Sequence, residues 1–157
     1  MRASSIRLRP VLDELDRLQR FIRRFCERHG VTEVLRNRMQ LACEEWFVNV
    51  VKHGFGGAAA DSSVPPRITA SFKLTSPGEV MIRLADNAPP FNPDDHPAPD
   101  LSLPAEQRPI GGLGVYLILK LASRHRYERV DGRNELTLYM TENAHRDHER
   151  ENGEEPT

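Results

Sequence analysis

The first half of the chain carries two amphipathic helical patterns, over residues 10–29 and 33–53. In both, apolar residues recur at spacings of three and four, which is the period of one helix face. Gly30 predicts the end of the first helix, and Thr32 is a suitable N-cap for the second. The second helix is predicted to bury Leu35, Met39, Ala42, Cys43, Trp46, Phe47, Val50 and Val51.

The second half alternates apolar and polar residues, which predicts strands. Residues 67–74 and 80–86 form one expected hairpin, and residues 125–130 and 135–140 form another around an Asp-Gly turn. A short strand over residues 6–9 and an apolar helix over 115–123 complete the pattern. The predicted fold is an α+β two-layer sandwich, in which three helices cover one face of a mixed, mostly antiparallel sheet.

Composition and charge narrow the class of protein. The chain has 157 residues, 38% of them hydrophobic, with a net charge of −1, and no apolar run approaches twenty residues. Its two cysteines are not in a CxxC pair. We expect a cytoplasmic protein with one domain over residues 1–141 and a disordered, charged tail over residues 142–157, which carries six acids and two arginines. No basic stripe with interleaved aromatics suggests nucleic acid, and no segment suggests a membrane.

One polar column interrupts the apolar second helix. Glu45, Asn49 and either Lys52 or His53 fall at spacings of three and four, so they share a helix face. A solvated face has the same pattern, and so does the wall of a binding site. The spacing alone does not choose between them.

Two later segments favour the binding site. Asp86 ends a predicted strand, and seven of the twelve prolines follow it between residues 89 and 109, in a stretch with no regular period. Irregular segments of this length in small domains are usually functional. A glycine cluster at residues 111–114 then opens a helix, where free backbone amides suit a phosphate group.

The ordered set of motifs resembles the GHKL ATPases, the superfamily of gyrase and the sensor histidine kinases. Glu45 and Asn49 match the family's N box as EWFVN, DNAPPFNP at 86–93 matches the first glycine box, and GGLGVYLI at 111–118 matches the second. The resemblance covers roughly residues 6–141 and is greatest to the small anti-sigma-factor serine kinases. It implies the ATP-binding fold named after Bergerat.

The resemblance also implies a nucleotide site, with the proline-rich segment as its lid. Glu45 would be the catalytic base, Asn49 would hold Mg²⁺, and Asp86 would bind the adenine amino group of ATP. Arg108 would reach the phosphates, and the amides of the glycine cluster would cradle them. The residues implied at the nucleotide are Asn49, His53, Asp86, Ala88, Phe91, Arg108, Gly111, Gly112, Leu113 and Gly114.

The resemblance finally implies partners. A kinase of this type phosphorylates an anti-sigma-factor antagonist with a STAS domain, binds a sigma factor, and forms a homodimer through the first strand and helix. Ala88 stands where the family usually has glycine, and its methyl group would weaken nucleotide binding if it crowded the base. A catalytically weak binding module is therefore the competing interpretation.

Overall fold

The computed structural model describes residues 2–57, 60–95, 102–104, 106 and 112–143. Most of the predicted lid lies outside these residues. The predicted site residues Arg108 and Gly111 also lie outside them. The predicted tail lies outside them from residue 144 onward.

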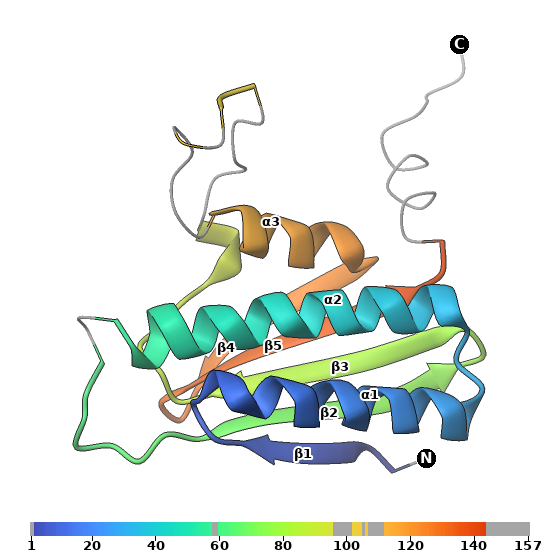
Figure 1. The fold of residues 1–157 in the computed structure, drawn as a ribbon, viewed down its shortest axis with the longest axis horizontal. Coiled ribbons are helices and arrows are strands. Elements are labelled where there is room, and N and C mark those ends of the chain that lie inside the picture. The colour runs from blue at the N-terminus through green and yellow to red at the C-terminus, as the bar shows by residue number, and fades with distance from the viewer. Residues whose placement is uncertain (1, 58–59, 96–101, 105, 107–111, 144–157) are drawn as a thin grey trace.

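A five-stranded sheet forms one layer of the molecule, with the strand order β1-β2-β3-β5-β4 (Figure 1). Every neighbouring pair is antiparallel, so the sheet that was expected to be mixed contains no parallel pair among the described residues. The strands are β1 (Ser4–Leu8), β2 (Ile68–Ser76), β3 (Glu79–Asp86), β4 (Arg124–Val130) and β5 (Arg133–Thr141).

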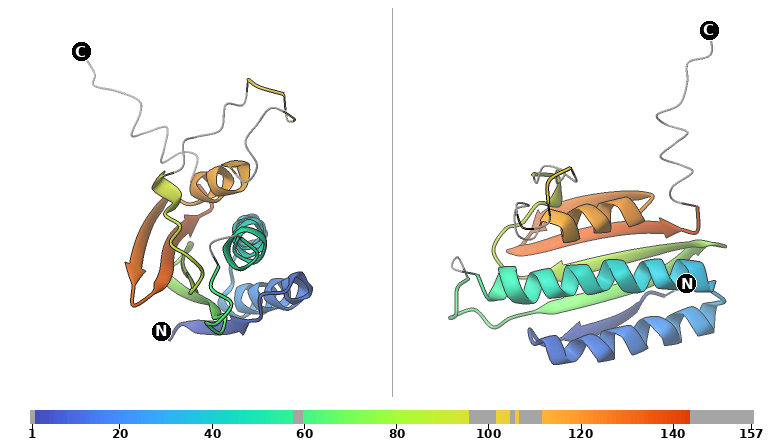
Figure 2. Two further views of the ribbon diagram at one scale, coloured as in Figure 1. Left: turned by 90° about the vertical axis from the view of Figure 1, so that its left-hand side faces the viewer. Right: turned by 45° about the horizontal axis from the view of Figure 1, so that its top comes forward.

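Three α-helices form the second layer, all on one face of the sheet (Figure 2). They are α1 (Leu15–His29), α2 (Glu33–Asn49) and α3 (Gly112–Leu121). The α+β two-layer prediction is confirmed. Gly30 ends α1 in the left-handed conformation, with φ at 64°, and the Thr32 hydroxyl accepts a hydrogen bond from the Leu35 backbone N–H at 3.4 Å.

The end of the second helix differs from the expected regular helix. From Val50 to Phe55 the backbone widens into a π-helical turn, in which the Gly56 N–H donates to the Val51 carbonyl at 3.1 Å. Such turns change the direction of the side chains that follow and are frequent at functional sites. His53 lies on this turn, while Asn49 lies on the regular part of the helix.

The core lies between the two layers. Leu35, Met39 and Phe47 of the second helix belong to the same buried cluster as strand residues such as Phe72 and Leu138. Trp46, which the apolar spacing predicts to be buried, is buried. In the part of the chain that the structure describes, no helix is both long and apolar enough to cross a membrane.

Candidate functional site

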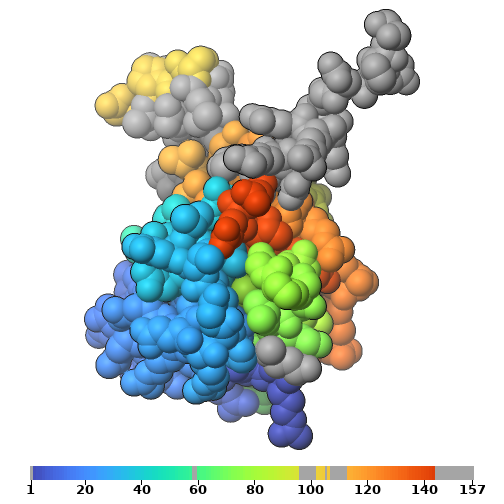
Figure 3. Space-filling view, turned by 90° about the vertical axis from the view of Figure 1, so that its right-hand side faces the viewer, coloured from blue at the N-terminus to red at the C-terminus, as the bar shows by residue number. Residues whose placement is uncertain are grey.

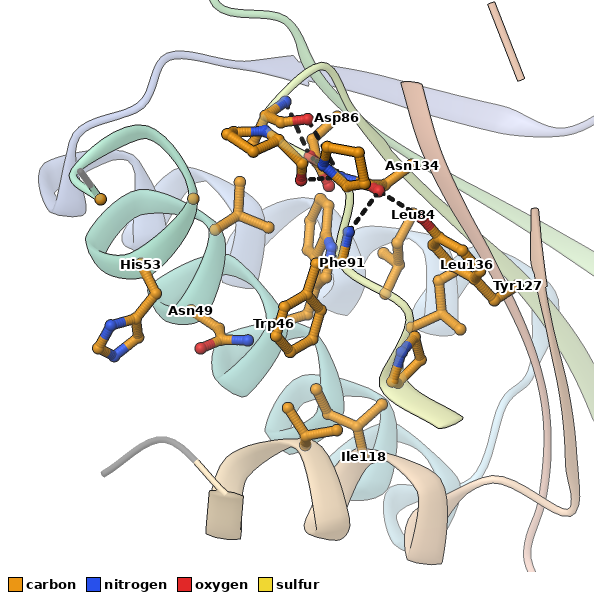
Figure 4. A pocket seen from close by; sticks show the side chains of 18 residues that line it. Trp46, Asn49, His53, Leu84, Asp86, Phe91, Ile118, Tyr127, Asn134 and Leu136 are labelled. Atoms are coloured by element: carbon orange, nitrogen blue, oxygen red, sulfur yellow. Dashed lines mark hydrogen bonds between the residues drawn. The ribbon is translucent and has the colours of Figure 1, made fainter. Parts of the chain in front are cut away.

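A cavity of about 270 Å³ opens at one end of the sheet, between α2, α3 and the segment that follows β3 (Figure 4). Its lining is mostly apolar, with a few polar groups from α2, β3 and β5, which is the usual make-up of a small-molecule site. The lining residues are Trp46, Asn49, Val50, His53, Gly54, Gly57, Leu84, Asp86, Ala88, Pro89, Pro90, Phe91, Pro93, Val115, Ile118, Tyr127, Asn134 and Leu136.

Asp86 is the buried carboxylate of this cavity, with an exposed fraction of 4%. Its Oδ1 accepts hydrogen bonds from the Asn134 side-chain amide at 2.9 Å and from the Ala88 backbone N–H at 3.1 Å. Burial raises the pKa of Asp86, and these two hydrogen bonds and the charge of Arg129 oppose the increase only in part. Within the described residues Oδ2 has no protein donor, so it can accept a hydrogen bond from a ligand.

Asn134 organises the wall around Asp86. Its Oδ1 accepts from the Phe91 backbone N–H at 3.0 Å and from the Tyr127 hydroxyl at 2.6 Å. These two donors fix the orientation of the amide, so that its NH₂ group faces Asp86 and the carbonyl of Pro89 (3.0 Å). Figure 4 shows this network.

Sequence reasoning missed Asn134. The residue lies two positions after the Asp-Gly pair of the turn, where an asparagine has no distinctive signal. Only the pairing of β3 with β5, which sets Asp86 opposite Asn134, brings the two side chains together.

Ala88 packs away from solvent, against the π-helical turn. A Cβ atom added to Gly54 would lie 3.0 Å from the Ala88 Cβ, which is closer than ordinary van der Waals contact. The two backbones can approach this closely because residue 54 is a glycine. The methyl group that departs from the family pattern therefore faces a glycine on the neighbouring element. Ala88 still forms part of the cavity wall.

The predicted polar column divides between this cavity and a second hollow. Asn49 and His53 line both, whereas Glu45 lines only the second, a groove of about 290 Å³ between α2 and α3. Glu45 lies directly against the start of α3, because a Cβ atom added to Gly114 would be 2.7 Å from Glu45 Oε2. The two hollows are therefore neighbours that share two polar residues.

The described part of the glycine cluster, residues 112–114, lies within the helix rather than before it. Gly112, Leu113 and Gly114 form the first turn of α3, and the amides of a helix's first turn have no partner inside the helix. Leu113 and Gly114 also line the groove. Free amides beside Glu45 and Asn49 are suited to an anion such as phosphate.

No group of three or more His, Cys, Asp or Glu side chains suited to a metal occurs among the described residues. His125 contacts Asp94 at 2.6 Å through its Nε2. The amide oxygen of Asn49 is a hard ligand of the kind that Mg²⁺ accepts when phosphates and water complete its shell. The donor set therefore fits a magnesium ion that arrives with a phosphate ligand.

Comparison with known proteins identifies the class. The family described as "Histidine kinase-like ATPase domain" matches residues 8–140, and the chain belongs to this family. The family resemblance read from the motifs is thus confirmed.

Individual relatives extend the comparison. The chain is 30% identical over 104 residues to the serine/threonine-protein kinase BtrW of Bordetella bronchiseptica, an alignment that covers 66% of this chain and 69% of that protein. It also resembles a crystal structure of the RsbU and RsbW domains of Rv1364c from Mycobacterium tuberculosis, with a TM-score of 0.61 and 16% identity. That match covers 90% of this chain and 32% of the other, so the chain spans about a third of that protein and shares its fold there.

Proposed function

We propose that this protein is an ATP-dependent protein serine kinase of the anti-sigma-factor type, which phosphorylates a STAS-domain antagonist and thereby controls a sigma factor. One observation carries the proposal. The cavity with a buried carboxylate and the groove with a half-buried carboxylate share Asn49 and His53, so a nucleotide and an acceptor can meet between them.

Asp86 would select the base of the nucleotide. Its Oδ1 is occupied by two protein donors, which leaves Oδ2 to accept from an exocyclic amino group. Adenine presents such a donor, whereas guanine has a carbonyl oxygen at the same ring position. A buried carboxylate therefore favours ATP over GTP.

Asn49 and the first turn of α3 would hold the phosphates. The amides of Gly112, Leu113 and Gly114 donate to phosphate oxygens, and the Asn49 amide oxygen is the protein ligand for Mg²⁺. Bound Mg²⁺ would neutralise charge on the β- and γ-phosphates.

Glu45 would act as the general base. The oxygen of the acceptor serine forms a bond to the γ-phosphorus, while the bond from that phosphorus to the oxygen bridging to the β-phosphate breaks. ADP leaves with the electron pair of the broken bond. The serine proton passes to the Glu45 carboxylate and then to water.

Substitution of Glu45 and Asn49 tests these roles. In Glu45→Gln the shape stays and the base is lost, so ATP should bind with parental affinity while phosphate transfer falls by about 10² to 10⁴. In Asn49→Ala the magnesium-dependent part of ATP binding should decline together with transfer. Calorimetry with Mg-ATP measures binding, and intact mass of STAS-domain proteins from the same genome measures transfer.

Glu44→Gln is the matched control, because Glu44 is the adjacent carboxylate on α2 and lines neither hollow. It should leave binding and transfer at parental values. Parental transfer by Glu45→Gln would remove Glu45 from the role of base. If the parent binds ATP but phosphorylates no STAS-domain protein, the chain is a nucleotide-binding module rather than a kinase.

A further inference from the structure

Apolar side chains are exposed along the outer side of α2 and α3. Val34 (55% exposed), Leu41 (38%) and Leu113 (48%) are three of the six large hydrophobic residues that are exposed among the described residues. On α2, Val34, Leu41 and Val48 follow one another at intervals of seven residues, so they form a line along one side of the helix. This line leads to the groove between α2 and α3.

The groove combines this apolar surface with the candidate base. Val48 comes from α2 and Leu113 and Leu117 from α3, while Glu45, Asn49, His53 and Gly114 complete the lining. Within the described part of the chain, Glu45 makes no hydrogen bond or ion pair. A carboxylate without a protein partner, at the edge of an apolar groove, can accept a hydrogen bond from a hydroxyl group that enters with an apolar neighbour.

We propose that the groove and the apolar line of Val34, Leu41 and Val48 are the docking surface for the protein substrate. The inference rests on the proposed kinase function and specifies how its substrate binds. The segment that docks carries a serine with an apolar side chain beside it. The serine faces Glu45, and the apolar side chain lies between Val48 and the leucines of α3.

The position of the groove favours a substrate protein over a second copy of this chain. Because the groove shares Asn49 and His53 with the nucleotide cavity, whatever occupies it faces the phosphate end of a bound nucleotide. A permanent dimer contact here would exclude the acceptor from Glu45. The exposed apolar line outside the groove supplies the additional area that a protein partner needs.

Leu41→Gln and Val48→Thr test the docking surface. The probe is a STAS-domain protein from the same genome that the parent phosphorylates or, in the absence of transfer, binds in the presence of Mg-ADP. Each variant should raise the KM for this protein about tenfold or more, because an apolar contact is lost, while kcat at saturating acceptor stays near the parental value. Leu41→Gln should also keep the parental affinity for Mg-ATP.

Val64→Gln is the control. Val64 is similarly exposed (43%) but lies in the segment before β2 and lines neither the groove nor the nucleotide cavity. It should leave the KM unchanged. Parental KM values for Leu41→Gln and Val48→Thr would overturn the docking surface and leave the kinase proposal intact.

Two further outcomes separate the proposals. A STAS-domain protein that binds the parent without being phosphorylated, and binds both α2 variants at least tenfold more weakly, would support the docking surface and refute the kinase. If no such protein binds or is phosphorylated, both proposals fail. A change in the sedimentation mass of Leu41→Gln would assign the surface to a second copy and overturn the inference.

Discussion

At the scale of single residues, Asp86 combines a stability cost with the proposed role in binding the nucleotide. Burial raises its pKa, so the folded protein without ligand holds the proton more tightly than the unfolded chain does. For such an acid, stability falls as the pH rises from the ordinary value of 3.8 through the raised value. At neutral pH the burial of the Asp86 carboxyl group therefore costs stability, which is typical of a group kept for function.

We expect Asp86→Asn to separate the two effects. It should weaken ATP binding by about 1.5 to 3 kcal/mol, because a charge-assisted hydrogen bond is lost, without lowering the melting temperature of the ligand-free protein. Calorimetry with ATP and GTP, together with thermal unfolding, measures both. Asp131→Asn, in the exposed β4–β5 turn, is the control. Equal affinity of the parent for ATP and GTP, unaltered by Asp86→Asn, would exclude Asp86 from the site.

At the scale of secondary-structure elements, two contacts join neighbouring segments. Glu14, next to the start of α1, accepts hydrogen bonds from the Arg9 backbone N–H at 3.2 Å and from the Arg17 guanidinium at 2.7 Å. Arg17 also donates to the Arg7 carbonyl at 2.9 Å, so this cluster attaches the edge strand β1 to α1. The second contact is that of Gly54 with Ala88, which sets the π-helical turn against the segment after β3.

The Glu14 cluster predicts a pH dependence of stability. Burial acts to raise the pKa of Glu14, but the hydrogen bonds from Arg9 and Arg17 outweigh it, so the pKa lies below the ordinary 4.5. The stabilisation is therefore complete well above pH 4.5 and is lost as the pH falls through the lowered value. Glu14→Gln should cost about 1 to 2 kcal/mol at pH 7, and less as the pH falls below 4.5.

Urea unfolding between pH 7 and pH 3 tests this prediction. Glu33→Gln serves as the control, since Glu33 is exposed and its contact with Arg36 is 3.8 Å long. A cost of Glu14→Gln that stays constant over this pH range would contradict the assigned role of the carboxylate.

The contact of Gly54 with Ala88 predicts a compensating pair. Gly54→Ala should lower the free energy of unfolding by about 1 to 3 kcal/mol and weaken ATP binding, since the new methyl group would displace the cavity wall. Adding Ala88→Gly to this variant should restore at least about 0.5 kcal/mol of the free energy of unfolding and at least about 0.5 kcal/mol of the free energy of ATP binding. Denaturation and calorimetry on the two single variants and the double variant measure the coupling. Strictly additive effects would show that the two residues act independently.

At the scale of the whole molecule, the sheet ends in two edge strands, β1 and β4. β1 is short, and its Ser5 and Arg7 side chains are exposed. An unpaired edge presents backbone groups that can pair with another chain. The resemblance to the anti-sigma-factor serine kinases also implies pairing through this strand and the first helix.

We therefore predict a homodimer that forms through β1. Sedimentation equilibrium at tens of micromolar should give twice the monomer mass of 17.9 kDa. Arg126→Glu is the control, because it changes the charge of β4, the strand at the opposite edge of the sheet. Arg126 does not line the cavity, so this variant should keep the sedimentation mass of the parent. Tyr127→Glu is unsuitable as a control because Tyr127 lines the cavity. A mass of 17.9 kDa throughout the concentration range would refute the dimer.

The sequence by itself determined the elements and the identity of the family. The spacing of apolar residues fixed two long helices and two hairpins, and Thr32, Gly30 and the Asp-Gly turn marked their boundaries. These features depend on interactions within a few residues, so they can be recognised locally. The motifs containing Glu45, Asn49 and Asp86 likewise lie in short segments that a family shares.

Only the tertiary structure decided how these segments meet. The register of β3 with β5 brings Asn134 to Asp86, the approach of two backbones pairs Ala88 with Gly54, and the packing of α3 on α2 sets Gly114 against Glu45. Each contact joins residues that are more than thirty positions apart. Local periodicity encodes which side of an element is buried, but not which residue of a distant element lies opposite. That choice depends on the packing of the whole sheet and its helices, which no single segment specifies.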